Sequence, residues 1–158
     1  MKIIECVPNF SEGKDKSLID KIIEPIKLHD NVQLLDVDQG FDTNRTVVTF
    51  IGTPESVINV AFECIKLASK LINMTKHSGE HPRMGATDVC PLVPVKDITM
   101  NECVSLSKIL AKRVAEELSI PTFLYENSAT QKDRVNLASI RKGEYEGMNE
   151  KLSKSNWK

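Results

Sequence analysis

The chain has 158 residues, 41% of them hydrophobic and 27% charged, a balance typical of one globular domain whose core needs no disulfide or metal. Its formal net charge of −1 creates no overall field for nucleic acid or an anionic membrane, so we expect neither as a partner. The apolar run at the start, MKIIECV, is far shorter than a signal peptide or a membrane span, so nothing in it indicates secretion.

Cysteine usage indicates a reducing compartment. The four cysteines form no C-x-x-C pair, and each lies in an apolar run, as a buried free thiol does. We therefore expect a cytoplasmic protein without disulfides. These cysteines are Cys6, Cys64, Cys90 and Cys103.

Strand and helix signals alternate from the start of the chain. The run KIIECV predicts a strand over residues 2–7, and PNFSEGK predicts a turn-rich loop after it. Isoleucines at helical spacing follow, and Asp15 or Ser17 can cap that helix. Pro25 should break or kink its end.

Two further strands are predicted over residues 32–38 and 45–52, both rich in branched side chains. The segment QGFDTN between them is long enough to be a functional loop and not a tight hairpin turn. A threonine, a proline and an acid then begin a helix expected over residues 53–74.

The second half continues the alternation. Residues 89–95 predict a strand whose two prolines favour a sheet edge. A capping box of the T-x-x-E type at Thr99 begins a helix that ends near Leu118. Residues 121–125 predict a fifth strand, and the polar remainder predicts short helices packed over an edge.

This order supports an α/β (α+β) fold in which helices cover one face of a mixed sheet. The first six elements have the βαββαβ order of ferredoxin-like folds, with an extra helix and strand after them. We expect one domain over residues 1–150 and a tail over 151–158.

The segment KHSGEHPRMGATDV holds two of the three histidines, His77 and His81. Their H-x-x-E-H spacing matches inverted zinc peptidases, in which both histidines lie on one helical face. Gly79 and Pro82 are poor helix formers, and no second Cys/His cluster completes a site. We therefore expect no metal here.

Acid–base chemistry fits the segment better, because an imidazole titrates near pH 6.5, about the physiological range. Glu80, Asp88 or the more distant Asp38 could orient the ring of His81, and Arg83 could bind a substrate carboxylate with its forked guanidinium. The alternative is a solvated loop in which Arg83 pairs with Glu80. Both interpretations stay open on these residues alone.

Two other segments carry polar residues at strand ends. Asp36 and Asp38 lie two apart on one strand face, and Asn44 and Arg45 open the next strand. Asn9 lies in the loop after the first strand and could contact a polar ligand.

Together, these stretches resemble the N-terminal subdomain of the formiminotransferase (glutamate formimidoyltransferase) family, often fused to a cyclodeaminase. The resemblance rests on ECVPNFSEG, LLDVDQGFDTNRTVVTF, HSGEHPRMGATDVCPLVPV, AEELSIPTFLYE and SIRKGEYEG, in this order over nearly the whole chain. It implies a ferredoxin-like subdomain of a dimeric enzyme of histidine breakdown and one-carbon metabolism. The family moves a formimidoyl group from N-formimidoyl-L-glutamate to N5 of the co-substrate tetrahydrofolate, and some members move a formyl group instead.

By this resemblance, His81 is the catalytic residue and Asp38 a carboxylate of the same site. The histidine would take a proton from folate N5 and return it to the departing glutamate nitrogen, with Asp38 stabilising its cation. The role of His77 stays open, and a rim position that touches the ligand only indirectly is favoured. The candidates for substrate binding are Arg45, Arg83, Asn9 and Asn44.

The family's transferase has two similar subdomains with folate bound in a tunnel between them, and this chain matches only the first. The tail at 151–158 falls where the linker to a second subdomain is expected. One hypothesis is an enzyme subunit that works as a homodimer or with a partner chain carrying the C-terminal subdomain. The other is a non-catalytic folate-binding or regulatory relative.

Overall fold

The computed structural model describes residues 1–157. The strands are β1 (Ile3–Cys6), β2 (Asn9–Phe10), β3 (Val32–Gly40), β4 (Arg45–Gly52), β5 (Thr87–Val89) and β6 (Leu92–Lys96). The α-helices are α1 (Lys16–Leu28), α2 (Pro54–Leu71), α3 (Met100–Leu118), α4 (Leu137–Arg141) and α5 (Met148–Ser153). Single 3₁₀ turns lie at Met74–Lys76, Glu126–Ser128, Lys132–Arg134 and Ser155–Trp157.

Strand β4 lies in the middle of the sheet, with β3 on one side and β1 and β2 on the other. Strand β6 flanks β1, and β5 flanks β2. The order β1-α1-β3-β4-α2-β6 is the predicted βαββαβ order. The prediction of a mixed sheet is wrong, because every pairing is antiparallel. Each helical crossover skips one strand position, so the strands that a helix joins are never neighbours.

Two segments of the sheet are each divided into a pair of short strands, β1 with β2 and β5 with β6. The chain leaves β1 at Val7–Pro8 and resumes as β2, where the sequence had predicted only a loop. Pro8 lacks an N–H, but its carbonyl accepts a hydrogen bond from Val48 at 3.0 Å, so the path stays attached to β4. The strand predicted over 89–95 is likewise two strands, β5 and β6, and lies at the sheet edge as expected.

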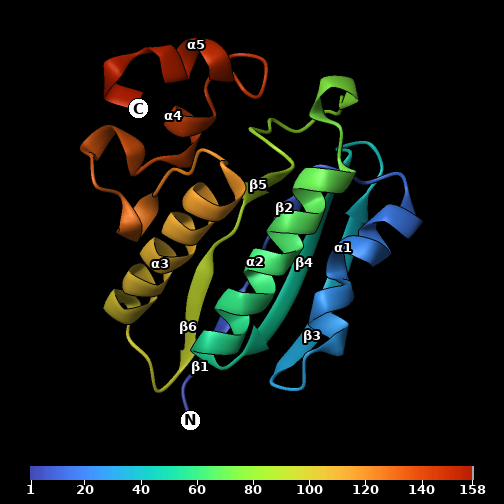
Figure 1. The fold of residues 1–158 in the computed structure, drawn as a ribbon, viewed down its shortest axis with the longest axis vertical. Coiled ribbons are helices and arrows are strands. Elements are labelled where there is room, and N and C mark those ends of the chain that lie inside the picture. The colour runs from blue at the N-terminus through green and yellow to red at the C-terminus, as the bar shows by residue number, and fades with distance from the viewer. Residues whose placement is uncertain (158) are drawn as a thin grey trace.

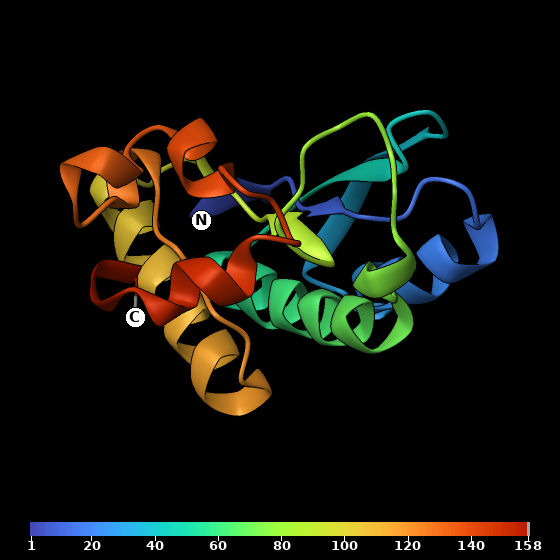
Figure 2. The same ribbon diagram turned by 90° about the horizontal axis from the view of Figure 1, so that it is seen from above.

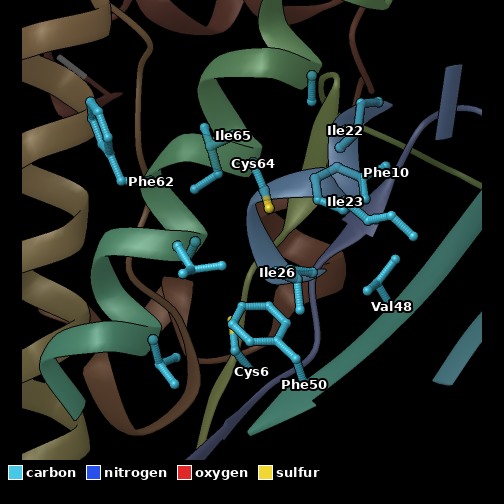
Figure 3. Close-up of a cluster of buried hydrophobic side chains, with 14 of the residues drawn as sticks. Cys6, Phe10, Ile22, Ile23, Ile26, Val48, Phe50, Phe62, Cys64 and Ile65 are labelled. Carbon is cyan, nitrogen blue, oxygen red and sulfur yellow. The ribbon is translucent and has the colours of Figure 1, made fainter. Parts of the chain in front are cut away.

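Helices α1, α2 and α3 cover one face of the sheet (Figures 1 and 2). Alternate residues of β4 are buried beneath them, and Figure 3 shows Val48 and Phe50 among the isoleucines of α1 and the side chains of α2. Helix α1 begins at Asp15, whose carboxylate accepts a hydrogen bond from the Leu18 N–H. It continues through Pro25, because Ile26 beyond the proline is buried in the core and offsets the lost hydrogen bond.

The connection between β3 and β4 is a tight hairpin, and the prediction of a long loop there is wrong. Gly40 pairs with Arg45, which leaves four residues in the turn. Asn44 takes the left-handed conformation that such turns need, with a φ of 48°. Its backbone N–H donates to the Phe41 carbonyl at 3.1 Å.

Residues 121–125 form no strand, contrary to the prediction. Thr122 donates to the Ala111 carbonyl of α3, and the Phe123 ring meets Trp157 edge-on with centroids 5.7 Å apart. These contacts hold the segment against the helices and away from the sheet. The C-terminal residues fold as short helices, as predicted, and α5 runs across position 150. The last residue of the proposed tail, Lys158, lies outside the described residues.

All four cysteines are free, and three of them are buried in the apolar core. Burial raises the pKa of Cys6 and of Cys64, so these thiols stay protonated at neutral pH. Of the helices within residues 1–157, none is both long and apolar enough to cross a bilayer.

Candidate active site

The face of the sheet opposite the helices carries a row of candidate residues. Asp38 lies opposite Val47, and Asn9 lies opposite Val47 from the other side. Directly opposed residues point to the same face, and the neighbouring Val48 points into the core. Arg45, two residues before Val47 on β4, shares this open face.

His81 lies beside Arg45, and its ring is held at both nitrogens. Arg45 Nη1 donates to Nε2 at 2.7 Å, and Nδ1 lies 2.6 Å from the Pro82 carbonyl oxygen. An arginine can only donate and a carbonyl can only accept, so the ring is neutral with its proton on Nδ1. Nε2 therefore carries the lone pair that can accept a proton, and it points toward the Arg45 guanidinium on the open face.

The hairpin turn between β3 and β4 supports the loop that carries His81. The Asn44 side chain donates to the Ser78 carbonyl at 3.0 Å, and the Glu80 N–H donates to the Asp42 carbonyl at 3.1 Å. Gly79 permits this approach, since an added Cβ would lie 2.3 Å from the Thr43 carbonyl oxygen. The turn thereby fixes where His81 meets the start of β4.

Asn44 joins three segments and is nearly fully buried. Besides its bond to Ser78, its side-chain oxygen accepts from the Gly13 N–H at 2.8 Å. Its carbonyl accepts from Nε2 of His77 at 2.8 Å. These contacts make Asn44 a residue that positions the loop, and they give no support to the prediction that it binds substrate.

Arg83 has a similar structural environment, with 6% of its surface exposed. Its Nε donates to Nδ1 of His77 at 2.9 Å, and its Nη2 donates to the His77 carbonyl at 3.0 Å. The remaining donors bind Glu146 at 2.6 and 2.8 Å and Glu144 at 3.4 Å. Because its donors are all engaged, the prediction that Arg83 binds a substrate carboxylate has no support from this geometry.

Glu144 and Glu146 are the residues that the sequence reasoning missed. The hydrogen bond from Arg83 lowers the pKa of Glu146 to about 2. The signal in the sequence is this pair of acids, which comes shortly after the basic residues Arg141 and Lys142. The sequence alone does not reveal that their partner is Arg83. The two acids tie the end of the chain to the loop of His77 and Arg83.

Asp38 and Asn9 differ in burial, because Asn9 has only 8% of its surface exposed. Asp38 is exposed, and the hydrogen bonds and ion pairs found within residues 1–157 include none between Asp38 and His81. The Asn9 side chain donates to the Val7 carbonyl at 3.0 Å. Both residues lie on the same face as Arg45, so an extended ligand could span them.

The two histidines of the H-x-x-E-H spacing do not share a helix, since residues 77–81 follow the 3₁₀ turn as an irregular loop. Their Nε2 atoms face different partners, the Asn44 carbonyl and the Arg45 guanidinium. Within the described chain, no group of three or more His, Cys, Asp or Glu side chains is arranged to hold a metal ion.

Residues 3–158 match the family described as formiminotransferase domain, N-terminal subdomain. The chain belongs to the formiminotransferase family. It is 57% identical over 99% of its length to formimidoyltransferase-cyclodeaminase of Dictyostelium discoideum, of which it covers 29%.

Two shorter family members are also similar. Glutamate formimidoyltransferase of Streptococcus pyogenes serotype M1 is 54% identical over 99% of the chain, which covers 52% of that protein. The enzyme of the same name from Thermoplasma acidophilum is 44% identical over the whole chain, which covers 53% of it. The chain thus spans about half the length of these two transferases and matches the N-terminal subdomain of the family.

Proposed function

We propose that this chain forms the His81 half of a transferase site that moves a formimidoyl group from N-formimidoyl-L-glutamate to N5 of tetrahydrofolate. The observation that carries the proposal is the contact between Arg45 and Nε2 of His81 on the open face of the sheet. It joins an imidazole that can act as a base to a cation that can bind a carboxylate. The relatives named glutamate formimidoyltransferase support the reaction.

The contact suggests an order of events. In the free protein, Arg45 covers the lone pair that His81 needs as a base. A carboxylate of the incoming glutamate derivative binds Arg45 and draws it away, which frees Nε2. His81 then takes the proton from folate N5 as N5 attacks the amidine carbon, and it returns that proton to the glutamate nitrogen as the C–N bond breaks.

The other candidates take supporting roles in this proposal. Asp38 lies on the same face and stabilises the imidazolium that forms between the two proton transfers. Asn9 contacts substrate from the neighbouring strand. Asn44 and Arg83, together with His77, hold the loop so that His81 stays in register with Arg45.

We further propose that a second subdomain or partner chain covers the open face and closes the substrate site. The relatives of the transferase type are about twice as long as this chain, which supports a missing half. Val93, opposite Glu5 of β1, adds an exposed apolar side chain to the open face. A homodimeric, ferredoxin-like protein of one-carbon metabolism and histidine breakdown fits this assembly, and free thiols support a cytoplasmic location.

The test is formimidoyl transfer from N-formimidoyl-L-glutamate to tetrahydrofolate by the purified chain, alone and with the C-terminal subdomain of the Streptococcus pyogenes relative. We expect turnover in the mixture. His81→Ala should lower kcat by roughly 10²–10⁴-fold, with partial rescue by added imidazole. Arg45→Met should mainly raise KM for the glutamate derivative.

His29→Ala is the matched control, because His29 lies at the end of α1 and its ring, among residues 1–157, accepts a hydrogen bond from the Asn31 N–H alone. We expect that variant to keep full activity. Folate binding without turnover, both by the chain alone and with the added subdomain, would favour the non-catalytic folate-binding or regulatory module instead. Equal loss of activity in His29→Ala and His81→Ala would remove His81 from the mechanism.

A further inference from the structure

A second feature of the molecule lies on the helix side of the sheet. A cavity of about 820 Å³ lies between the C-terminal half of α2, helix α3, strands β5 and β6, and the segment over 120–148. Small-molecule sites in proteins have volumes of roughly 300–1,000 Å³. The cavity is therefore large enough for a ligand, and its lining does not include His81, Arg45 or Asp38.

The lining of the cavity is apolar and adaptable. Four of the five methionines in the chain contribute to it. Methionine is flexible and polarizable, and binding surfaces that accept apolar groups of varied shape are rich in it. These residues are Met74, Met84, Met100 and Met148.

One hydroxyl of the lining lacks a partner. Thr87 lies opposite Phe10, whose ring is buried on the helix side, so the Thr87 side chain points toward the cavity. Its Oγ1 is buried, and no hydrogen-bond partner for it occurs within the described chain. Buried polar atoms are nearly always paired, so a ligand group in the cavity would complete this one.

The charged residues that line the cavity are Lys70, Asp88 and Glu126, and with Arg141, which pairs with Asp88, their formal charges cancel. The Asp88 carboxylate accepts hydrogen bonds from Arg141 and from the Met84 N–H, the latter at 2.7 Å. Burial raises the pKa of Tyr125 to about 12, so its phenol stays neutral. An uncharged ligand suits such a lining better than an anion or a cation.

One wall of the cavity is already formed in the free protein. Residues 84–88 line it, and Ser11 binds that segment through its hydroxyl to the Gly85 carbonyl at 2.7 Å and its N–H to the Ala86 carbonyl at 2.9 Å. We propose that this cavity binds a small, uncharged, mainly apolar molecule that hydrogen-bonds to Thr87. The site is separate from the transferase function proposed above.

The test uses N-phenyl-1-naphthylamine, an uncharged aromatic probe with one N–H, and measures its binding to the purified chain by isothermal titration calorimetry. We expect saturable binding of one probe per chain. Ala111→Phe fills the cavity from α3 and should weaken binding about tenfold or more. Ala115→Phe, one turn further along α3 at an exposed position outside the lining, should leave it unchanged.

Thr87→Val tests the hydrogen bond. It keeps the shape of the side chain and should weaken probe binding about fivefold. Because the hydroxyl has no partner in the free protein, the same variant should keep or raise the midpoint of thermal unfolding. Loss of binding together with a lowered midpoint would mean a damaged fold, and it would overturn the role of Thr87.

Three other outcomes would overturn the proposal. The first is the absence of saturable binding, and the second is binding that Ala111→Phe and Ala115→Phe weaken equally. The third is a dimer, detected by sedimentation, that Ala111→Phe dissociates and Ala115→Phe does not. That last result would make the cavity a contact between two copies of the chain.

Discussion

The covered face of the sheet holds Ile4, Val48 and Phe50 with no exposed surface, whereas the open face holds Asp38, Arg45 and the neighbouring His81. Residues of both kinds alternate along the same strand, β4, so one backbone serves two purposes. The covered face supplies stability through burial. The open face contributes little to stability and keeps its polar groups available for a ligand.

The largest expected effect comes from truncating the covered face. Phe50→Ala removes a fully buried ring and should lower the free energy of unfolding by about 3–5 kcal/mol. Val93→Ala on the open face, where the side chain is partly exposed, should change it by less than about 0.5 kcal/mol. Urea unfolding at equilibrium measures both variants, and similar losses would show that another chain already covers the open face.

The two arginines of the site extend the comparison. Arg83→Met removes a buried guanidinium from His77, Glu144 and Glu146 and should lower the free energy of unfolding by about 3 kcal/mol. This loss of free energy is at the low end for a buried ion pair because both carboxylates left behind are exposed. Arg45→Met should cost less than about 0.5 kcal/mol.

Hydrogen exchange and urea unfolding together test this contrast. In Arg83→Met, we expect faster exchange of the amides at residues 144–148, which the arginine holds against the loop. In Arg45→Met, that segment should exchange as in the unmodified protein. Faster exchange there in Arg45→Met, or none in Arg83→Met, would contradict the division between a positioning and a substrate-binding arginine.

Most of the fold could be predicted from local patterns. The bounds of β4 and the capping box of α3 were as predicted, because alternation and capping are properties of adjacent residues. Strand β2 and the coil at 121–125 were not predicted. Partners far along the chain decide whether such a short segment pairs with a sheet or packs on a helix.

The site shows the same limit. His81 and Arg45 were both selected from the sequence, but their contact joins residues 36 positions apart, which no spacing rule reveals. Arg83 and Asn44 were predicted as ligand contacts from their chemistry alone. Burial and the number of hydrogen bonds they already make, which only the folded structure supplies, indicate their positioning roles.

Two glycines of the His81 loop offer a comparison at smaller scale. Gly79→Ala places a Cβ 2.3 Å from the Thr43 carbonyl oxygen, and the backbone must shift, at a cost of roughly 2 kcal/mol. Gly85→Ala meets no atom within 4 Å and should be close to neutral. Thermal unfolding measures the difference, and equal midpoints for the two variants would mean that the loop does not lie on the hairpin turn.

The smallest expected effect is the pH dependence of the ion pair between Arg83 and Glu146. The pKa of Glu146 is about 2 in the folded protein, below its usual value of 4.5, so the folded state favours the ionised carboxylate. The resulting stabilisation is complete above about pH 4.5 and is lost as the pH falls toward 2. Because Glu146 is exposed, water and salt screen the interaction, and the effect should shrink further at high ionic strength.

Glu146→Gln should therefore lower the urea midpoint at neutral pH, and the difference from the unmodified protein should vanish as the pH approaches 2. Glu150→Gln changes the net charge equally but touches neither Arg83 nor His77, since Glu150 pairs with Lys154 at the C-terminal end of α5. A difference that persists at pH 2 would assign the loss to packing and not to the charge of Glu146. A matching pH profile in Glu150→Gln would assign the lower urea midpoint to net charge. The Arg83–Glu146 ion pair would then have no part in the acid sensitivity of the fold.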